Sequence, residues 1–456
     1  MTPQPITQGE LGAHLARLEE AGAALRAMPL PERIAAIDRV AARWRHPSSR
    51  WRARARESLA RTTGLAPAAI SYALEHLWSA ITARELTAVA AREIGADAGA
   101  PERLAFHSLA GNVPGVGVFG MIAALLAGVP SIVKTARREP ALPLLVAASL
   151  AEEDRRLGEA LAVAHWPGGS DAHEALAVAG SSVVLAYGRD DTLDRLAARA
   201  AARLLRFGPR LSIALVCRDA ADDRTAAAAA RQTALYDQQG CLSPQYLVLE
   251  ETDGDATTAF VDALATAFRH LERDLPRAPL TLDEVTETWR FLERERWRAQ
   301  EGAAVRVVAG AGFGVVCDRS GTPPASPLNR HLVVLPVPSP AAAEPLLGHL
   351  IGLVEAVGVT APSNRRAEAA AFAAALGAHR LCPLERMQAP PFGWRQSGHP
   401  RLASFLVPPA RAARPHLATA DGTDAAPRTS PSPAAAPPAF EPVHDAEIAA
   451  APVLSS

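Results

Sequence analysis

The sequence predicts an α/β protein built on doubly wound, mostly parallel sheets, and three observations support this fold class. From about residue 103, short apolar runs alternate with helical patterns, as expected for parallel strands covered by helices. The chain has 456 residues, so we expect two or three lobes instead of one core. Hydrophobic residues make up 49% and charged residues 21%, which allows a large core and excludes global disorder.

The residues before 103 read mostly as helices. Two apolar stripes at helical spacing support this: Leu11, Leu15, Leu18 and Leu25, and then Ile70, Leu74, Leu77 and Ile81. Strands are expected afterwards at 104–109, 131–134, 161–165, 182–187, 211–217, 246–250, 304–308, 313–317, 331–336 and 379–382. The helical patterns between them include 191–205 and 341–355. Ligands of such sheets bind beyond the carboxyl ends of the strands.

Composition excludes several classes of protein. A net charge of −1 argues against nucleic acid as a bulk electrostatic partner. The four cysteines form no CxxC or CxxH pair, which argues against a disulfide scaffold or a zinc cluster and fits the cytoplasm. The beginning of the chain carries acidic residues and no secretion signal. Residues 104–133 lack Asp, Glu, Lys and Arg, but their glycines and prolines indicate strand, turn, helix and strand instead of a membrane span.

Residues 410–456 are expected to be a disordered tail. Ten of the 38 prolines lie within 408–456, and few apolar residues there are spaced for packing.

Lys134 is the only lysine among 47 basic residues, and asparagine occurs only at Asn112, Asn329 and Asn364. The excess of Arg, Ala, Pro and Gly indicates a coding bias against lysine and asparagine. Lys134 ends the predicted strand 131–134, where its compact ammonium could reach ribose hydroxyls or phosphate. Just before it, Gly115-x-Gly117-x-x-Gly120 follows a strand and opens a helix. Two interpretations of this short pattern stay open: a loop that binds a dinucleotide, and an ordinary apolar glycine turn.

Cys241 is the candidate nucleophile. It follows Gly240 in the polar run 236–245, between a helical stretch and a strand. Polar groups and a glycine around a cysteine suit a reactive thiolate better than a thiol packed in a core. Cys217 and Cys317 end apolar strands and Cys382 follows a short one, so all three are expected to be buried and inert.

Together the motifs resemble the aldehyde dehydrogenase superfamily, and most closely its acyl-CoA reductase branch of the LuxC type. They are Gly-Asn-Val-Pro at 111–114, Ile-Val-Lys at 132–134, Trp-Pro-Gly-Gly at 166–169, Tyr-Gly-Arg at 187–189, Phe-Gly-Pro-Arg at 207–210 and Asp-Gln-Gln-Gly-Cys at 237–241. The resemblance covers roughly 100–405 and includes a closing Pro-Pro-Phe-Gly-Trp at 390–394. It implies a helical region at 1–100, a dinucleotide-binding domain at 101–236 and a catalytic cysteine domain at 237–409.

The resemblance also assigns roles to residues. Cys241 matches the nucleophile, and the Asn112 side-chain amide matches one donor of the oxyanion hole, with the Cys241 backbone N–H as the second. Lys134 matches the lysine that holds the cofactor's adenosine ribose. The turns that contain Pro167, Gly168, Gly188 and Gly208 are expected to bind the cofactor.

Two departures from the superfamily pattern are informative. Aldehyde-oxidising members carry a glutamate about 35 residues before the cysteine, as the base for hydrolytic water, but Arg206 and Phe207 stand there in this chain. An acyl-enzyme on Cys241 would therefore exchange with CoA and accept hydride more readily than it would hydrolyse. Arg137 stands where NAD-preferring members often place a ribose-binding glutamate, which favours NADPH over NADH; the alternative is that Arg137 is a solvated bystander.

The implied function is NADPH-dependent reduction of an acyl-CoA or other acyl thioester, with long-chain fatty acyl groups favoured, to the aldehyde. Two alternatives stay open: a CoA-acylating aldehyde dehydrogenase working in the oxidative direction, and a cysteine acyltransferase that uses no nicotinamide. The expected partners are the acyl-CoA or acyl-protein donor, an acyl-protein synthetase or carrier, and further copies of the chain. No metal is expected. Among other polar residues, His107 and Trp166 are expected to pack, Asp237 to cap a helix, and 329–331 to border the nicotinamide or to be structural.

Overall fold

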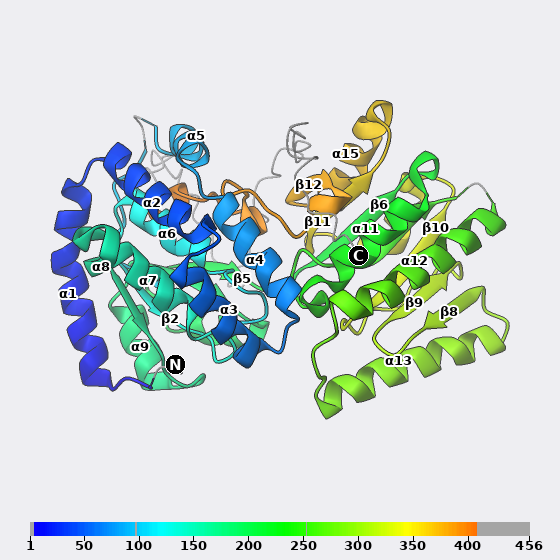
Figure 1. Cartoon of the computed structure of the whole chain (residues 1–456), viewed down its shortest axis with the longest axis horizontal. Helices are drawn as coiled ribbons and strands as arrows, with labels where there is room; N and C mark the ends of the chain where they lie inside the picture. The colour runs from blue at the N-terminus through cyan, green and yellow to red at the C-terminus, as the bar shows by residue number, and fades with distance from the viewer. Residues whose placement is uncertain (1–3, 96–97, 252, 408–456) are drawn as a thin grey trace, which may run out of the picture.

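The computed structural model describes residues 4–95, 98–251 and 253–407. Two α/β lobes lie side by side, with the amino-terminal helices covering the first lobe (Figure 1). The predicted tail at 410–456 lies outside the described residues. No helix in the described part of the chain is long and apolar enough to cross a membrane.

Five helices precede the first strand, as the sequence predicts. They are α1 (Gln8–Ala27), α2 (Leu30–Arg45), α3 (Arg50–Thr63), α4 (Pro67–Ser79) and α5 (Ala83–Glu93). Thr7 and Glu10 form a capping box at the start of α1, and Gly64 ends α3 in the left-handed conformation. Trp44 of α2 stacks on Trp78 of α4 with ring centroids 4.6 Å apart. Both rings belong to the apolar cluster that the helical region shares with the first lobe.

The first sheet contains five parallel strands in the order β3-β2-β1-β4-β5. In chain order these are β1 (Ala105–Ser108), β2 (Ser131–Lys134), β3 (Leu161–Ala164), β4 (Val183–Tyr187) and β5 (Arg203–Phe207). The crossovers carry α6 (Val118–Ala127), α7 (Leu142–Glu153), α8 (Arg155–Glu159), α9 (Asp171–Ala179) and α10 (Asp190–Ala197). All ten residues of α6 are buried, which accounts for the uncharged stretch at 104–133 without a membrane.

The second sheet has seven strands in the order β12-β11-β6-β7-β10-β9-β8, and only β8 runs antiparallel to its neighbour. The strands are β6 (Leu211–Val216), β7 (Pro244–Glu250), β8 (Val305–Ala309), β9 (Gly314–Asp318), β10 (His331–Val337), β11 (Val354–Thr360) and β12 (Arg380–Pro383). They are covered by α11 (Asp223–Ala234), α12 (Gly254–Asp274), α13 (Leu282–Gln300), α14 (Glu344–Leu347) and α15 (Arg366–Ala375). This arrangement is the doubly wound α/β class that the sequence predicts.

Three details differ from the sequence-based expectations. Strand β5 lies in a segment expected to be helical, because α10 ends at Ala197 and Leu205 and Phe207 then face the core. Strand β11 follows a helical pattern that breaks into short turns at Gly348 and Gly352, the latter with φ +81°. The sheets also divide the chain between β5 and β6, whereas we expected the second domain to begin at 237.

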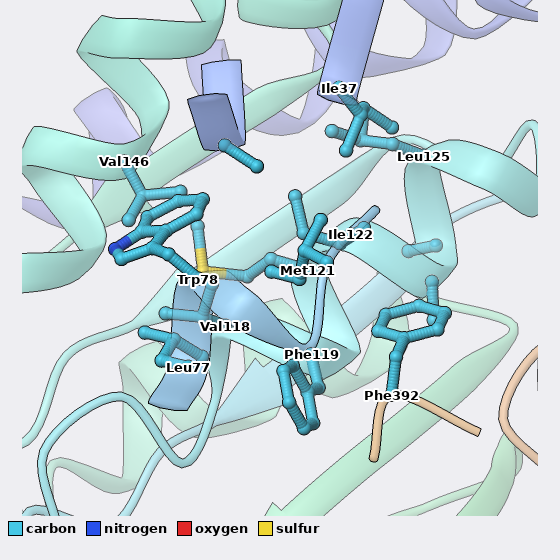
Figure 2. Packing of buried hydrophobic residues seen from close by; sticks show 14 of the residues in the cluster. Ile37, Leu77, Trp78, Val118, Phe119, Met121, Ile122, Leu125, Val146 and Phe392 are labelled. Carbon is cyan, nitrogen blue, oxygen red and sulfur yellow. The ribbon is translucent and has the colours of Figure 1, made fainter. Parts of the chain in front are cut away.

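The segment after β12 returns to the first lobe and completes its core. Phe392 contacts Phe119 of α6 edge to face, with ring centroids 5.4 Å apart, and Figure 2 shows this pair beside Trp78 and Met121. Further along, the backbone N–H of Leu402 donates to the buried Glu93 carboxylate at 2.6 Å. We call residues 390–407 the closing segment. It links the end of the second lobe to the helices that cover the first.

Candidate active site

Cys241 lies in the loop before β7, at the amino-terminal edge of the second sheet. Its side chain is half-buried and packs against Leu242, Ala356 and Trp394. The Ser212 hydroxyl donates to the Cys241 carbonyl at 2.7 Å and accepts the Ala356 N–H at 3.1 Å. One side chain at the start of β6 therefore fixes the cysteine loop to β11.

The loop before the cysteine is held by a buried ion pair. Tyr236, Asp237 and Gln238 all have positive φ angles, a strained conformation that the surroundings must maintain. Arg330 donates to the Asp237 carboxylate, with Nη2 2.6 Å from Oδ1, and the other carboxylate oxygen accepts the Ala278 N–H at 3.1 Å. Asp237 thus orients the cysteine loop and does not cap a helix, which corrects our expectation.

Asn112 reaches the cysteine loop from the other lobe. It follows β1, and its side-chain amide donates to the Gln239 carbonyl at 2.6 Å, two residues before Cys241. Gln239 in turn donates to the Asn329 side chain at 2.8 Å. A small depression, partly open to solvent, is lined by Asn112, Gln239 and Asn329 together with the charged Arg138, Asp237 and Glu284 and the apolar Leu65 and Leu280. The structure therefore brings Asn112 and the cysteine loop together.

Electrostatics keep Cys241 in the thiol form. Burial raises the pKa of its thiol far above the ordinary value, and the nearby carboxylate of Glu355 raises it further, whereas Arg210 and Arg380 act in the opposite direction. Cys217, Cys317 and Cys382 are buried and form no disulfide, and burial is what their sequence positions predict. Burial raises the pKa of Cys217 and of Cys317 to about 11. Cys241 differs from them in exposure, because its side chain is half-buried and theirs are buried.

Lys134 lies at the carboxyl end of β2, half-buried, with its ammonium 5.9 Å from the ring centroid of Trp166. Burial lowers the pKa of Lys134, and the Glu174 carboxylate opposes this effect. Glu174, on α9, is 2% exposed, and its Oε2 accepts no hydrogen bond although Arg199 lies 3.6 Å away. Glu174 therefore lies between Arg195 and Arg199 and is close enough to Lys134 to affect the pKa of its ammonium.

The other predicted cofactor residues lie along the same edge of the first sheet. Pro167 and Gly168 follow β3, Gly188 follows β4 and Gly208 follows β5. A Cβ added to Gly168 would meet nothing within 4 Å, so no side chain fills the space above it. Arg137 is exposed on the turn after Lys134. All of these turns lie at the carboxyl ends of the strands, where ligands of parallel sheets bind.

The glycines at 115, 117 and 120 do not form a phosphate loop. The Gly115 N–H donates to the buried Glu139 carboxylate at 2.6 Å, and burial raises the pKa of Glu139 to about 8. A Cβ at Gly117 would lie 2.4 Å from the Leu109 side chain, and one at Gly120 would contact His107. These glycines let α6 approach β1, which supports the apolar-turn interpretation over the dinucleotide signature.

The remaining polar residues have structural contacts. His107 is fully buried, lies 3.2 Å from the Ser131 hydroxyl, and has a pKa lowered by burial to about 3. Trp166 packs against Phe106, with ring centroids 6.0 Å apart. The described residues contain no group of three or more His, Cys, Asp or Glu arranged to hold a metal ion.

Two residues at the site were missed from the sequence. Glu355, fully buried on β11, interrupts the apolar run Val354–Thr360, and a lone charge in such a run was an available signal. Trp394, 8% exposed and packed with Cys241, has an indole N–H without a hydrogen-bond partner among the described residues. At the position of the expected hydrolytic base, Arg206 is exposed and Phe207 stacks on Tyr187.

Solved structures show which fold class this is. An NAD-dependent benzaldehyde dehydrogenase from Corynebacterium glutamicum is similar with a TM-score of 0.65 and 16% identity, covering 84% of this chain and 87% of that chain. The NADP complex of an NADP-dependent glyceraldehyde-3-phosphate dehydrogenase from Bacillus halodurans C-125 has a TM-score of 0.65 and 13% identity, covering 83% of each. The protein has the aldehyde dehydrogenase-like α/β fold.

Within that fold class, the chain belongs to the acyl-CoA reductase (LuxC) family, whose model matches residues 25–407. It is 29% identical over 211 residues to long-chain acyl-protein thioester reductase 2 of Photobacterium leiognathi, covering 44% of this chain and 43% of that protein. The corresponding reductase of Photobacterium phosphoreum is 28% identical over 200 residues, covering 43% and 40%. The matched segments thus span less than half the length of these relatives.

Proposed function

We propose that this chain reduces an acyl thioester to the aldehyde through an acyl-enzyme on Cys241. Membership of the acyl-CoA reductase family and the names of the relatives support this reaction class. The observation that carries the proposal is the contact between Asn112 and the cysteine loop, because it joins a side-chain amide donor to a half-buried thiol across the two lobes.

The chemistry follows from the positions of these groups. The Cys241 sulfur attacks the thioester carbonyl, and the thiol of the donor leaves. Asn112 and the Cys241 backbone N–H stabilise the oxyanion, an arrangement in which each donor contributes roughly 3–4 kcal/mol in other enzymes. No carboxylate stands at 206–207 to activate water, so the acyl-enzyme persists until it is reduced. When bound, the nicotinamide supplies the hydride.

The cofactor that we propose is NADPH. Lys134 and Glu174 would hold the adenosine ribose at the edge of the first sheet, and the exposed Arg137 would meet a 2′-phosphate. Pro167, Gly168, Gly188 and Gly208 would keep that edge open for the rest of the cofactor. Residues 101–210 and 211–389 would then act as the cofactor and catalytic domains.

The proposed donor is a long-chain fatty acyl group carried by CoA or by a protein. Support for a long acyl chain comes from the names of the relatives, which are long-chain acyl-protein thioester reductases. An acyl-protein synthetase or carrier is the partner that an acyl-protein donor would require. None of the four cysteines forms a disulfide, which suits the cytoplasm.

One experiment tests the reaction. The protein is incubated with acyl-CoAs of several chain lengths and with NADPH or NADH, while cofactor absorbance and aldehyde are measured. Aldehyde formed in step with NADPH loss supports the proposal, whereas acyl transfer without nicotinamide consumption indicates an acyltransferase. If NADP⁺, CoA and aldehyde react much faster than the reverse mixture, the oxidative direction is favoured.

A further inference from the structure

The outer face of α13 carries apolar side chains that the described residues leave exposed. Leu282, Val285, Trp289 and Trp297 are 80%, 47%, 61% and 61% exposed, and their spacing places them on one side of the helix. We call these four residues the α13 stripe. The opposite side of the helix carries the buried Phe291, which packs in the core of the second lobe. Figure 1 shows α13 at the lower edge of that lobe.

The two tryptophans of the stripe are exceptional in this chain. It contains seven tryptophans, and the other five are buried. Contiguous exposed apolar patches mark interaction sites on soluble proteins, and tryptophan is enriched among the residues that contribute most to binding. The α13 stripe therefore has the composition of a contact with another protein surface.

Charge is distributed unevenly along the same helix. The residues of α13 before Trp289 include three acids, Asp283, Glu284 and Glu287, and no base, whereas those after it include four arginines and two glutamates. Two copies of α13 packed antiparallel would place the acidic half of each helix against the basic half of the other. A two-fold axis between identical chains produces such a pairing, in which the same surface serves both partners. The helix is thus complementary in charge to a second copy of itself.

We propose that the α13 stripe is the contact between two copies of this chain, with their α13 helices antiparallel across a two-fold axis. With about 250 Å² for a whole tryptophan side chain, the two indoles of one copy expose roughly 300 Å². The four indoles of the dimer would supply roughly 600 Å² of the about 1,000 Å² that a specific interface buries. Leu282, Val285 and the charged side chains beside them add to this area. The inference is independent of the reaction that the chain catalyses.

The test measures the mass of the full-length chain by sedimentation over a range of micromolar concentrations. We expect the wild-type chain to associate. Replacing both tryptophans, Trp289→Ala with Trp297→Ala, should raise the dissociation constant at least about 100-fold, because the dimer loses four indoles. At a given concentration the mass of the assembly should then fall by half. Association that this variant leaves unchanged overturns the proposal, since the chains would meet through another surface.

Ile351→Ala with Leu353→Ala is the matched control. These side chains are 59% and 46% exposed and belong to the same lobe, but they lie in the turn before β11. Their replacement should leave the dissociation constant unchanged. A loss of association equal to that of the tryptophan variant would mean that exposed apolar area in general, and not the α13 stripe, drives association.

A pair of charge-reversal variants tests the contact without relying on the tryptophans. Asp283→Arg with Glu287→Arg makes both halves of α13 basic, and Arg290→Glu with Arg296→Glu makes both halves acidic. All four side chains are exposed. Each variant alone should lose association through repulsion between like charges, whereas an equimolar mixture of the two should recover it. Recovery also shows that both variants fold. A mixture that stays dissociated overturns the proposal.

A wild-type chain that stays monomeric at the highest concentration also overturns the proposal. Quenching of tryptophan fluorescence by acrylamide then identifies what covers the stripe. If the two indoles are shielded in that monomer, residues 408–456 of the same chain occupy the stripe in place of a second copy. If they are quenched freely, the stripe stays open in solution.

Discussion

The side-chain amide of Asn112 lies 2.6 Å from the backbone carbonyl of Gln239, and this hydrogen bond joins the first lobe to the cysteine loop of the second. An amide nitrogen carries two N–H groups, so one remains for a second acceptor. In the proposed reaction, the oxyanion would accept a hydrogen bond from this second N–H of Asn112.

Asn112→Ala should therefore lower kcat for aldehyde formation by roughly 10²–10³-fold, because one of two oxyanion donors is lost. Steady-state kinetics with an acyl-CoA and NADPH would measure this. Asn364→Ala, at another exposed asparagine far along the chain, is the control and should be silent. If kcat in Asn112→Ala stays near the wild-type value, Asn112 serves only to join the lobes.

Cys241→Ala should abolish reduction and covalent labelling by a radioactive acyl-CoA, because the nucleophile is gone, while NADPH affinity stays nearly unchanged. Cys217→Ala should still be labelled, because that thiol is buried directly after β6. Its only cost should be the stability lost when a buried side chain is made smaller. Label that persists on Cys241→Ala would place the nucleophile elsewhere.

Arg137→Glu should shift preference from NADPH toward NADH. A charge-assisted contact to phosphate is worth roughly 1.5–3 kcal/mol, so the ratio of kcat/KM values should change by at least about tenfold. The exposed Arg155 on α8, which pairs with Glu159, offers a control substitution to glutamine that should leave this ratio unchanged. A constant ratio in Arg137→Glu would mean that the 2′-phosphate is recognised by other residues.

Lys134→Arg retains the charge but replaces a compact ammonium by a planar guanidinium beside Trp166 and Glu174. We expect the KM for the cofactor to rise well beyond twofold, with the thermal midpoint of the cofactor-free protein nearly unaltered. Acylation of Cys241, which needs no nicotinamide, should proceed. Wild-type cofactor kinetics in this variant would contradict the proposal that Lys134 binds the ribose.

Asp237→Asn should destabilise the protein. Arg330 is 2% exposed, and removal of its partner leaves a buried charge that usually costs roughly 3–5 kcal/mol. Glu272 lies 3.5 Å from Arg330 and still pairs with it in this variant, so we expect the loss of unfolding free energy to lie near the lower end of that range. Denaturant unfolding would measure the change. Asp191→Asn, which breaks an exposed ion pair, is the control, and its free energy of unfolding should stay within about 0.5 kcal/mol of wild type. An equal loss of stability in both variants would contradict the prediction that the buried pair matters more.

Much of the site could be predicted because its members lie in short local motifs. Cys241 and Asn112 are brought together in the structure, and Lys134 ends its strand as predicted, although their roles stay predictions. The second sheet was harder, because β11 follows a helical pattern and β5 lies within one. Glu355 was marked only by its lone charge in an apolar run, and Glu174 could not be placed near Lys134 because that position depends on packing between α9 and β2.

The closing segment also affects when the first lobe can finish folding during translation. Phe392, Leu402 and Phe405 are fully or almost fully buried beside α6 and the helices that cover it, yet they are among the last described residues to be made. Domains generally fold as they leave the ribosome, starting from the amino terminus. The first lobe can only do so incompletely, because part of its core is still untranslated while the second lobe emerges. A ribosome stalled before residue 390 would therefore present a nascent chain with an apolar helix partly uncovered, which is a natural ligand for a chaperone.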